Sequence, residues 1–294
     1  MDYVSSSSVT RSNASDVPLL SIIIVNYETK GLLKYCLKRL FASSLPKSTE
    51  VIVVDNASKD GSAEWLTNEE LRMKNHADHS LRNSLFVIHN SRNVGFGAGN
   101  NEGIRRARGK YCFLMNPDIV IHEGALQHLL AFLDEHPKAA AVGPRLTHPD
   151  GTLQHSRFRF PDVWIPLYRR TPLGRFAFAR RAIDHYCMSD VDHTKPHKVD
   201  WLLGAAILAR RSAIERAGLM DERYFLYFED IDWCRRFWKE GFEVWYEPKA
   251  MLTHFHQRLS AEATGLHTLF SFATRAHIAS GIKYFLKWGI RNNS

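Results

Sequence analysis

Residues 19–25, with the sequence LLSIIIV, form an unbroken apolar run rich in β-branched residues that stops at the polar pair Asn26-Tyr27. Such a run predicts a strand that is buried on both faces, as strands of parallel sheets are. Similar runs follow at residues 50–54, 85–88 and 111–115. Stretches with helical spacing or many glycines separate them, so the sequence predicts an α/β fold with a Rossmann-like, mostly parallel sheet flanked by helices.

The remaining elements are less regular. Residues 146–198 are rich in Pro, Arg and aromatic side chains and predict a long loop, which we expect to form a lid over the site. Regular structure is expected to return after this segment. The other expected elements are helices over 32–41, from about 63, over 211–217 and near 230, and a last strand over 244–246.

Composition limits the class of protein. With 294 residues and 45% hydrophobic content, the chain can bury a sizeable core. Residues 1–17 are polar and Ser-rich and predict a disordered tail, not a signal peptide. No run reaches the roughly 18 apolar residues that span a bilayer, so a soluble or peripheral protein is expected. The four cysteines form no close pair, which favours a reducing cytosol.

A formal net charge of +8 is compatible with nucleic acid, an anionic membrane surface or a phosphorylated substrate. Basic residues interleaved with exposed aromatics are not evident, so no nucleic-acid partner is expected. Residues 270–290 mix aromatic side chains with Arg275, Lys283 and Lys287 at roughly helical spacing. Such a helix either lies on an anionic membrane or packs on the domain.

The apolar run at 111–115 ends at Asn116-Pro117-Asp118. An acid at the tip of a buried strand, held by a turn, suits a hard cation and its phosphates. The alternative is an ordinary exit from a strand, where Asp and Pro are common. His254 and His256 follow the last expected strand, and an imidazole there could complete a cation site begun by Asp118.

Two other polar stretches follow expected strands. Asp55 ends the second strand and begins the loop DNASKDGS, so it is a candidate for binding a base or ribose, while Asp60 or Ser62 caps the next helix. The glycines of residues 93–103 could let backbone amides approach a pyrophosphate or could let a helix pack closely on the sheet. Their spacing is not that of a dinucleotide fingerprint, which disfavours nicotinamide binding.

Three acids, Glu229, Asp230 and Asp232, occur within four residues in an aromatic surround. Burial and mutual repulsion would raise the proton affinity of at least one of them, which suits a general base. Asp232 is also placed to pair with Arg235 or Arg236 on a helix. We expect Glu229 and Asp230 to be functional and Asp232 to be structural.

Taken together, these segments resemble the inverting GT-A glycosyltransferases of family 2, in particular the rhamnosyltransferase-like branch. The resemblance runs from about residue 18 to 260, through SIIIVNYETKGLLKYCL, VIVVDNASKDGS, NVGFGAGNNEGI, FLMNPDI, the block VDWLLGAAILARR to FEDIDWCRR, and THFHQRLS. It implies a GT-A domain over 18–260. The remaining residues, 261–294, are expected to form a C-terminal helical segment, for which membrane association and packing on the domain both stay open. The resemblance also implies that Asn116-Pro117-Asp118 replaces an Asp-x-Asp metal motif with one fewer charge.

The resemblance implies a role for each candidate residue. The nucleotide-sugar would contact residues that follow the first four strands: Asn26, Tyr27, Glu28, Asp55, Asn93, Gly95, Asn100, Asn116 and Asp118. The cation, Mg²⁺ or Mn²⁺, would be held by Asp118 and His254. Asp230 would act as the catalytic base beside Glu229, and Trp201 and Gly204 would border the acceptor, with the Trp201 ring face open to a sugar.

The expected activity is that of a hexosyltransferase, with rhamnose as the first choice of sugar. The donor would be a dTDP-, UDP- or GDP-sugar and the acceptor a glycan or lipid-linked glycan of a surface polysaccharide. The expected location is the cytoplasm, peripheral on the inner face of the cytoplasmic membrane. The alternatives are a non-catalytic nucleotide-sugar-binding scaffold of the same fold and a nucleotidyltransferase, although the latter usually has a Gly- and Arg-rich phosphate loop that SIIIVNYETKG lacks.

Overall fold

The structure, a computed structural model, describes residues 17–46, 48–75, 84–255 and 272–290. The first half of the chain alternates strands and helices, as predicted. The strands are β1 (Leu20–Asn26), β2 (Thr49–Asp55), β3 (Leu85–His89) and β4 (Tyr111–Met115). The helices are α1 (Lys30–Phe41), α2 (Ser62–Lys74) and α3 (Phe96–Arg106).

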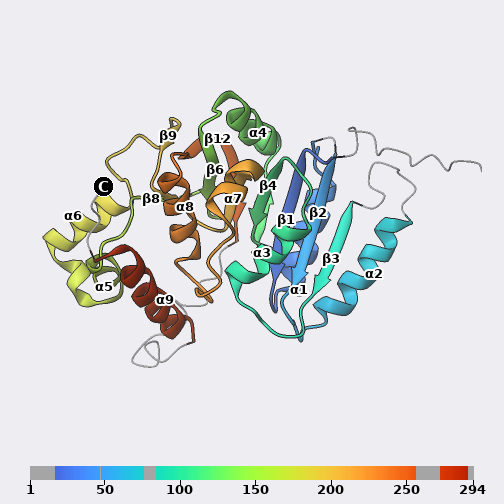
Figure 1. Cartoon of the computed structure of the whole chain (residues 1–294), viewed down its shortest axis with the longest axis horizontal. Coiled ribbons are helices and arrows are strands. Elements are labelled where there is room, and N and C mark those ends of the chain that lie inside the picture. Colours follow the sequence, from blue (N-terminus) through green and yellow to red (C-terminus); the bar gives the residue numbers. More distant parts are fainter. Residues whose placement is uncertain (1–16, 47, 76–83, 256–271, 291–294) are drawn as a thin grey trace, which may run out of the picture.

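These strands belong to one mixed sheet with the order β3-β2-β1-β4-β11-β6-β12-β5 (Figure 1). Neighbours among β1 to β4 are parallel. The central element β11 (Ala206–Arg210) is antiparallel to β4 and to β6 (Ala139–Thr147), whereas β12 (Glu243–His254) is parallel to β6. The sheet is therefore mostly parallel, and the predicted α/β fold class is confirmed.

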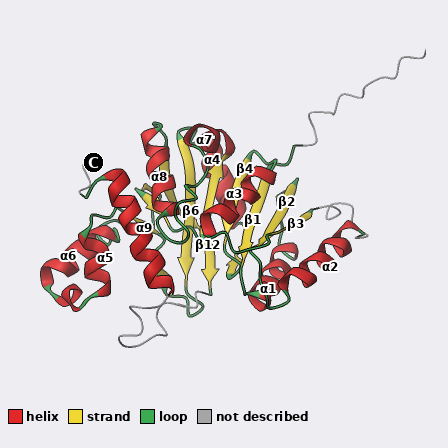
Figure 2. Cartoon of the chain, turned by 60° about the horizontal axis from the view of Figure 1, so that its bottom comes forward, coloured by secondary structure: helices red, strands yellow, loops and turns green. Residues whose placement is uncertain are grey.

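The core lies on both faces of β1, as its apolar run predicts. Ile22, Ile23 and Ile24 are all fully buried. Ile23 faces one core cluster together with Ile104 of α3, and its two neighbours face the other, which includes Leu33 of α1. Helices cover both faces of the sheet in Figure 2. A charged residue in this strand would face a core on either side, which explains why the run contains no charge.

The order of the strands reverses beside β1. From β1 the chain moves outward to β2 and β3, and then crosses through α3 to place β4 on the other side of β1. Open α/β sheets bind ligands at the carboxyl ends of the strands where such a reversal occurs. Asn26 ends β1, and Asn116 follows β4 directly. The strand order therefore predicts a ligand site at these two strand ends.

The expectation of a structureless loop over residues 146–198 is wrong. The chain forms short pieces that pack on the end of the sheet. They are β7 (Leu153–Gln154), β8 (Arg157–Phe158), α5 (Trp164–Arg170), the 3₁₀ turn η1 (Pro172–Arg175), α6 (Ala177–Tyr186) and β9 (His197–Lys198). Elements of two to ten residues give too few repeats for a hydrophobic period to be recognised in the sequence.

Other elements also differ from expectation. The sequence did not predict α4 (Ala125–Glu135), β5 (Ile119–Ile121), β6 or β10 (Trp201–Leu202). The expected last strand over 244–246 is the start of β12, whose twelve residues continue through Pro248. The pairing of β12 with β6 shifts register between Glu247 and Met251. A bulge of this kind accommodates a proline inside a strand.

The helix α7 (Arg211–Ala217) has the predicted bounds, and α8 (Glu229–Lys239) begins one residue before the predicted Asp230. Asp232 pairs with Arg236, one of its two predicted partners, at 3.0 Å. Its other oxygen accepts from the Trp288 indole at 2.7 Å and lies 2.7 Å from Lys287 Nζ. Asp232 therefore ties α8 to the C-terminal helix α9 (Phe272–Trp288).

The C-terminal helix packs on the domain with one face and is open on the other. Tyr284 is fully buried, and its hydroxyl accepts from Arg235 at 2.9 Å. Among the described residues no helix is long and apolar enough to cross a membrane. Residues 1–16 of the expected tail and His256 lie outside the described residues. The proposed division of the chain at residue 260 stays a prediction.

Candidate active site

Polar side chains from β1 and β2 are joined at the carboxyl end of the sheet. The Asn26 amide donates to Asp55 Oδ1 at 2.8 Å and to Ser58 Oγ at 3.0 Å. Asp55 Oδ2 accepts from the Ser58 backbone N–H at 3.1 Å. The parallel register places Asn26 beside Asp55, and both residues are buried. Asp55 thus holds the loop after β2 from within, with both of its oxygens already accepting hydrogen bonds.

Tyr27 and Glu28 form the open rim of this region. Tyr27 is 48% exposed, and Glu28 is exposed as well. The Glu28 backbone N–H donates to Ser58 Oγ at 3.0 Å, and its carboxylate accepts from the Lys59 N–H at 2.9 Å. A nucleoside approaching the sheet edge would therefore meet the Tyr27 ring and the Glu28 loop before it met Asp55.

Asn56 connects the loop after β2 to the loop after β3. Its amide donates to Asn93 Oδ1 at 2.9 Å and to the Gly95 carbonyl at 3.1 Å. Its oxygen accepts from the Asn90 amide at 3.0 Å and from the Val94 N–H at 3.1 Å. The sequence interpretation placed Asn93 and Gly95 at the site but gave Asn56 no such role. Only the fold shows that Asn56 holds both of them.

Part of the glycine-rich run serves the packing of α3 on the sheet. A Cβ atom at Gly99 would lie 3.0 Å from Val25 Cγ1, and one at Gly103 would overlap the Ile23 side chain. The alternative of close helix-on-sheet packing therefore holds for these two glycines. Asn100 is buried, and its amide donates to the Phe96 carbonyl at 3.0 Å within the same helix. Its predicted contact with the donor stays a prediction.

The first two glycines of the run face the acidic segment instead. Gly95 has a φ of +94°, and a Cβ there would overlap the Phe225 carbonyl oxygen, to which the Phe96 N–H donates at 2.9 Å. At Gly97 a Cβ would lie 3.3 Å from Glu229 Cβ. The absence of side chains at these positions lets the segment before α8 close against the start of α3.

Asp118 and His254 lie side by side. β5 and β12 pair antiparallel with Ile119 opposite His254, and the Phe255 N–H donates to the Asp118 carbonyl at 2.8 Å. This register brings His254 Nε2 to 3.2 Å from Asp118 Oδ1. His254 is 2% exposed and the Asp118 side chain 15% exposed. The structure thus brings together the two residues that were predicted to share a cation.

The geometry of this pair fits a divalent cation. His254 Nδ1 lies 2.9 Å from Gln154 Oε1, and with the proton on Nδ1 the Nε2 lone pair would face Asp118. Two neighbouring ligands of an octahedral Mg²⁺ or Mn²⁺ lie about 3 Å apart. Asp118 Oδ1 is buried and makes no hydrogen bond within the described residues. Gln154, which the sequence interpretation assigned to a lid, would fix the orientation of the imidazole.

The two residues would be a minimal protein contribution to a metal site. Within the part of the chain that the structure describes, no group of three or more His, Cys, Asp or Glu side chains converges. A Mg²⁺ or Mn²⁺ ion commonly keeps several waters and takes its remaining ligands from substrate phosphates. Asp118 and His254 therefore suit a cation that arrives with a nucleotide diphosphate better than one held by the protein alone.

Asp230 is held at the first turn of α8 by two backbone amides. Its Oδ2 accepts from the Gly204 N–H at 2.9 Å, and its Oδ1 accepts from the Ile231 N–H at 2.9 Å. A Cβ at Gly204 would lie 3.3 Å from Asp230 Oδ2 and 3.2 Å from the Phe96 ring. Gly204 is therefore needed for close approach, and its amide aims the Asp230 carboxylate.

Burial raises the proton affinity of both neighbouring acids. It raises the pKa of Asp230 to about 6, against the opposing effect of the hydrogen bonds from Gly204 and Ile231. Burial and the adjacent Asp230 raise the pKa of Glu229 well above its usual range. Glu229 Oε2 is buried and makes no hydrogen bond within the described residues. With a pKa of about 6, Asp230 is mostly ionised at pH 7 and can act as a base.

The acid near β4 and the acid of α8 border the same loop. The Asn116 N–H donates to the Ala205 carbonyl at 2.9 Å, which fixes the exit of β4 to residue 205. The preceding residue, Gly204, donates to Asp230. Asp118 lies two residues beyond Asn116. The short loop at residues 204–205 thus contacts both the exit of β4 and the first turn of α8.

Unusual backbone conformations gather at this end of the sheet. Four of the six non-glycine residues with positive φ in the described part of the chain are Glu28, Ala57, Tyr227 and Phe228. Such conformations are costly and persist where surrounding contacts hold them, often at functional sites. Tyr227 and Phe228 immediately precede the acids, so their conformation sets where α8 begins.

The C-terminal helix holds this strained pair. The Ser280 hydroxyl donates to the Leu226 carbonyl at 2.9 Å, and the Phe228 ring packs against Gly281 and the Tyr284 ring. His277 lies against both Tyr227 and Phe228. The helix that was expected to belong to a separate segment therefore supports the backbone that presents Asp230.

Trp201 is not placed as expected. It is 5% exposed, its ring stacks on Phe158 at 4.5 Å, and its indole donates to the Arg159 carbonyl at 2.9 Å. The ring face is therefore covered and is not offered to a sugar. Pairing of β10 with β8 turns Trp201 into the core and leaves the loop at 203–205 beside Asp230. Of the two predicted acceptor residues, the structure brings only Gly204 to the acids.

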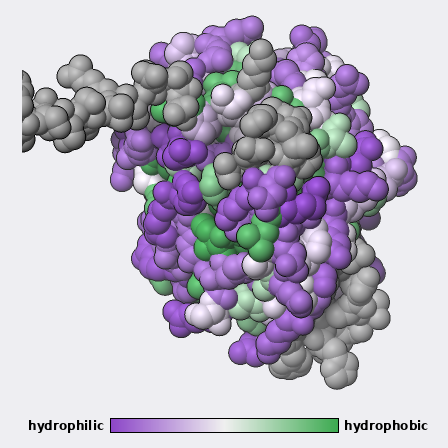
Figure 3. Space-filling view, turned by 90° about the vertical axis from the view of Figure 1, so that its right-hand side faces the viewer, coloured by the Kyte–Doolittle hydropathy of each residue, from purple (hydrophilic) through white to green (hydrophobic). Residues whose placement is uncertain are grey.

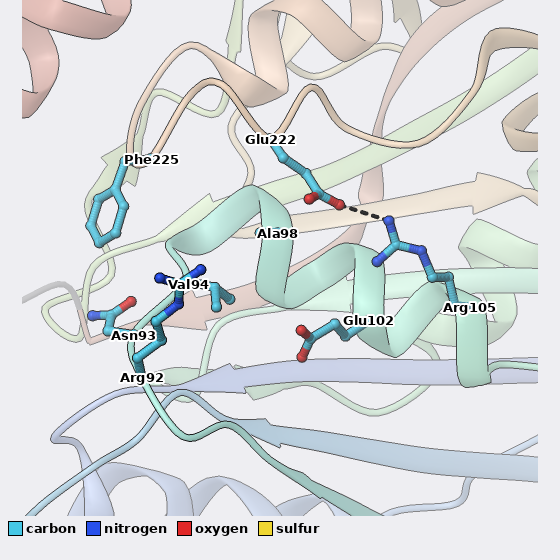
Figure 4. A pocket seen from close by; sticks show the side chains of 8 residues that line it. All are labelled: Arg92, Asn93, Val94, Ala98, Glu102, Arg105, Glu222 and Phe225. Carbon is cyan, nitrogen blue, oxygen red and sulfur yellow. Dashed lines mark hydrogen bonds and ion pairs between the residues drawn. The ribbon is translucent and has the colours of Figure 1, made fainter.

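A pocket of about 400 Å³ extends along α3 (Figure 4). Asn93 and Phe225 lie at the amino end of the helix beside Arg92, and the ion pair of Arg105 with Glu222, at 2.7 Å, lies at the other end. The pocket shares Asn93 with the predicted donor site, but Asp118 and Asp230 do not line it. It is thus adjacent to the candidate active site and distinct from it.

Comparison with known proteins also indicates a glycosyltransferase. Residues 21–196 match the model of glycosyl transferase family 2. The chain is 28% identical over 229 residues to an N-acetylglucosaminyl-diphospho-decaprenol L-rhamnosyltransferase of Mycobacterium tuberculosis, which covers 73% of this chain and 70% of that protein. It is 26% identical to a rhamnosyltransferase of Escherichia coli over 68% of this chain and 73% of that protein.

Solved structures share the fold at low identity. The chain aligns with GalNAc-T7, solved with UDP, GalNAc and Mn²⁺, at a TM-score of 0.60 and 16% identity over 81% of this chain. It aligns with a mannosyltransferase of Pyrobaculum calidifontis, solved with GDP-Man and Mn²⁺, at a TM-score of 0.57 and 16% identity over 83% of this chain. It spans 44% and 59% of those two chains. These neighbours confirm the expected GT-A fold.

Proposed function

Because the chain belongs to glycosyl transferase family 2, we propose that it is an inverting hexosyltransferase that uses a nucleotide-sugar donor. The acceptor in this proposal is a hydroxyl of a glycan or lipid-linked glycan. The observation that carries it is the pair of acids bordering one loop: Asp118, beside His254, and Asp230, held by Gly204. The first site suits a diphosphate with its cation, and the second supplies a base.

In the proposed reaction Asp230 accepts the proton of the acceptor hydroxyl. The oxygen of that hydroxyl forms a bond to the anomeric carbon while the bond from this carbon to the donor diphosphate breaks, so the configuration inverts. The nucleoside diphosphate leaves with the bonding electrons. Asp118 and His254 would hold a Mg²⁺ or Mn²⁺ that neutralises the charge of this leaving group.

The remaining residues would position the donor. Tyr27 and Glu28 form the exposed rim that a base and ribose would meet, and Asn26 and Asp55 support this rim from below. Asn93 and Gly95, joined through Asn56, would border the diphosphate and sugar. Asn100 and Asn116 are also proposed to contact the donor.

In this proposal Glu229 supports the segment around Asp230 and does not act as a second base. Burial and the adjacent Asp230 raise its pKa, which favours its protonated form. Its Cβ and Cγ lie against the start of α3, where Gly97 leaves room for them. We propose that Glu229 keeps the first turn of α8 closed against α3.

Rhamnose is our first choice of sugar, with dTDP-rhamnose ahead of UDP- and GDP-sugars. Two relatives named as rhamnosyltransferases support this choice. The first of them is named for an acceptor with a diphospho-decaprenol lipid, which supports a lipid-linked acceptor. We further propose a cytoplasmic location at the inner face of the membrane, where such an acceptor would be reached.

Thermal shift against dTDP-, UDP- and GDP-sugars, with and without Mn²⁺ or Mg²⁺, tests donor and cation together. A ligand present at 100 times its dissociation constant should stabilise the folded state by about 2.7 kcal/mol. A donor that stabilises the chain only with the cation would support the assignment of Asp118 and His254. If no nucleotide-sugar changes the unfolding temperature, the proposal is wrong.

Turnover separates the enzyme from a non-catalytic scaffold. Replacing Asp230 by Asn should leave donor binding near that of the unmodified chain and lower turnover by about 100-fold or more. A scaffold of the same fold would bind the donor and release no nucleoside diphosphate in either form. A nucleotidyltransferase would release pyrophosphate instead, so the identity of the phosphate product distinguishes the third candidate.

A further inference from the structure

The surface of α5, η1 and α6 combines exposed rings with arginines. Trp164, Phe176 and Phe178 are 55%, 56% and 58% exposed, and Leu167 and Leu173 are each 39% exposed. The rings form a connected group through Tyr168, with centroids 6.4 Å apart for Trp164 and Tyr168 and 5.7 Å for Tyr168 and Phe178. We name this group, with the exposed Arg175, Arg180 and Arg181, the basic aromatic face.

The sequence of this region carries a net positive charge. Residues 164–186, from the start of α5 to the end of α6, contain five arginines and one acid, Asp184, so they contribute +4 in a chain with a net charge of +8. The flanking acid Asp162 is engaged locally, since its Oδ1 accepts from the Trp164 N–H at 2.9 Å. Several large exposed rings in contact with one another are unusual on a surface that faces only water.

The opposite end of the molecule provides a comparison. The elements α5, α6 and α9 lie at the left end of Figure 1, and Figure 3 shows the face at the right end. That face is mostly hydrophilic, with a small apolar patch near its centre (Figure 3). The chain is therefore asymmetric, with exposed rings and arginines gathered at the end where the C-terminal helix also lies.

The C-terminal helix adds apolar side chains at the same end. The Val163 N–H donates to the Ile290 carbonyl at 3.3 Å, so the start of α5 adjoins the end of α9. Ile278, Ile282 and Leu286 recur every four residues and are 52%, 57% and 81% exposed. Two lysines of α9 are engaged by the protein, because Lys283 donates to the Arg223 carbonyl and Lys287 pairs with Asp232.

From these observations we propose that the basic aromatic face docks on an anionic lipid bilayer. Rings at the depth of the headgroups bury apolar area, while arginines alongside bind lipid phosphates. A second copy of the chain is a poorer occupant, because a two-fold contact through this face would oppose its three arginines with the same three arginines of the partner. The electrostatic contribution comes from residues 163–183, not from α9, whose lysines are largely occupied.

Docking here would place the candidate acceptor side near the membrane. Tyr186 at the end of α6 packs against Phe158 at 5.2 Å and Trp201 at 6.3 Å, and β10 leads directly to Gly204 beside Asp230. The consequence for a lipid-linked acceptor rests on the proposed function. The docking itself does not, because it depends only on the surface of the protein.

Flotation of the full chain with lipid vesicles tests the proposal without any nucleotide-sugar. The chain should float with phosphatidylcholine vesicles that contain about 30 mol% phosphatidylglycerol and stay behind with pure phosphatidylcholine. Each arginine at an anionic surface changes partitioning roughly fivefold, so R175A/R180A/R181A should weaken binding on the order of 100-fold. F176S/F178S should weaken it about tenfold or more per ring.

Matched controls keep the result interpretable. Y35S/L71S removes two apolar side chains of similar exposure, 48% and 51%, from α1 and α2, and should float as the unmodified chain does. All substituted residues are exposed, so circular dichroism and unfolding temperature should be unchanged. Turnover on a water-soluble acceptor should also be unchanged in F176S/F178S, which separates a failure of docking from a failure of the proposed reaction.

Three outcomes would overturn the proposal. The chain does not float with anionic vesicles, F176S/F178S floats as well as Y35S/L71S, or the unmodified chain sediments as a dimer that F176S/F178S converts to a monomer. The last result would assign the face to a second copy. Raising the salt from about 0.1 to about 0.5 M should release the chain from anionic vesicles, because screening weakens the contribution of the arginines.

Discussion

Replacing Asp230 by Asn should reduce activity and at the same time change how stability depends on pH. The folded chain binds a proton at Asp230 with a pKa of about 6, against the ordinary value of 3.8 for an exposed Asp. Between these values the folded state holds more protons than the unfolded state. The free energy of unfolding therefore falls as the pH rises through this window.

The size of the effect follows from the two pKa values. A difference of about 2 units corresponds to about 3 kcal/mol when the whole window is crossed. Between about pH 4.5 and 7, about 2 kcal/mol of this should appear. The amide that D230N introduces does not titrate, so this variant should gain about 2 kcal/mol relative to the unmodified chain over the same range. Glu229 would lose a charged neighbour in the variant, which acts in the same direction.

Comparing two pH values removes a complication of the substitution. Asn has one side-chain oxygen where Asp230 uses two, so either Gly204 or Ile231 loses its acceptor. That loss costs about 1–3 kcal/mol and is the same at both pH values. Urea unfolding of both proteins at pH 4.5 and 7 therefore isolates the titration of the carboxyl group.

Activity should change with pH in the opposite sense to stability. Asp230 acts as a base only when ionised, so the ionised fraction, and with it kcat/KM, should rise about tenfold from pH 5 to pH 7. The measurement requires saturating Mn²⁺, so that cation binding does not limit the rate at either pH. Equal pH dependence of unfolding in the two proteins, or unchanged turnover in D230N, would refute the reasoning about Asp230.

Three further predictions concern single contacts. Q154L should lower Mn²⁺ affinity or turnover by about 10- to 100-fold, because it removes the group that orients His254, and unchanged dependence on Mn²⁺ concentration would contradict this. G95A should cost about 1–3 kcal/mol in urea unfolding, since it combines positive φ with overlap of the facing carbonyl, whereas G151A, with positive φ but no close neighbour, should cost less. D232A should cost about 3–5 kcal/mol in the same assay, because it removes a fully buried charge that has two basic partners and an indole donor.

The sequence predicted those elements that are determined by neighbouring residues in the chain. Residues 111–115 were placed without error, because five consecutive apolar residues ending at Asn-Pro leave little choice of structure. The pairing of Asp232 with Arg236 also follows from spacing alone, since residues four apart on a helix are neighbours. Where burial on both faces or helical spacing decides, the sequence is sufficient.

Contacts that depend on the pairing of strands far apart in the chain could not be predicted from the sequence. His254 was proposed as a partner of Asp118 because imidazole is a common metal ligand, but the reason for their contact is the register of β5 on β12, and neither β5 nor the full length of β12 was predicted. Gln154 was assigned to a lid and is in fact opposite the His254 ring. A two-residue strand such as β7 has no period to recognise.

Trp201 shows a different limit. An aromatic residue next to a glycine-containing loop is compatible with a sugar platform and with a core position, and residue type does not distinguish them. The structure distinguishes them, because β8 places Phe158 against the ring and the Trp201 indole donates to the Arg159 carbonyl. Of the two residues predicted to border the acceptor, only Gly204 lies beside Asp230, where the absence of a side chain allows close approach.

The position of the acids depends on a helix that lies beyond the segment matched by the family. The segment 225–228 is held on one side by Gly95 at the start of α3 and on the other by Ser280 and Gly281 of α9. Because Tyr227 and Phe228 keep positive φ only while both sides hold, α9 contributes to the placement of Asp230 without touching it. A chain that ended near residue 260 would therefore lose two things at once. It would lack the exposed apolar side chains of α9 and also the support that α9 gives to the segment before the acids. Point substitutions at the exposed rings of η1 and α6 avoid this ambiguity, since those rings pack on one another and on Tyr168, away from the strained pair that sets the start of α8.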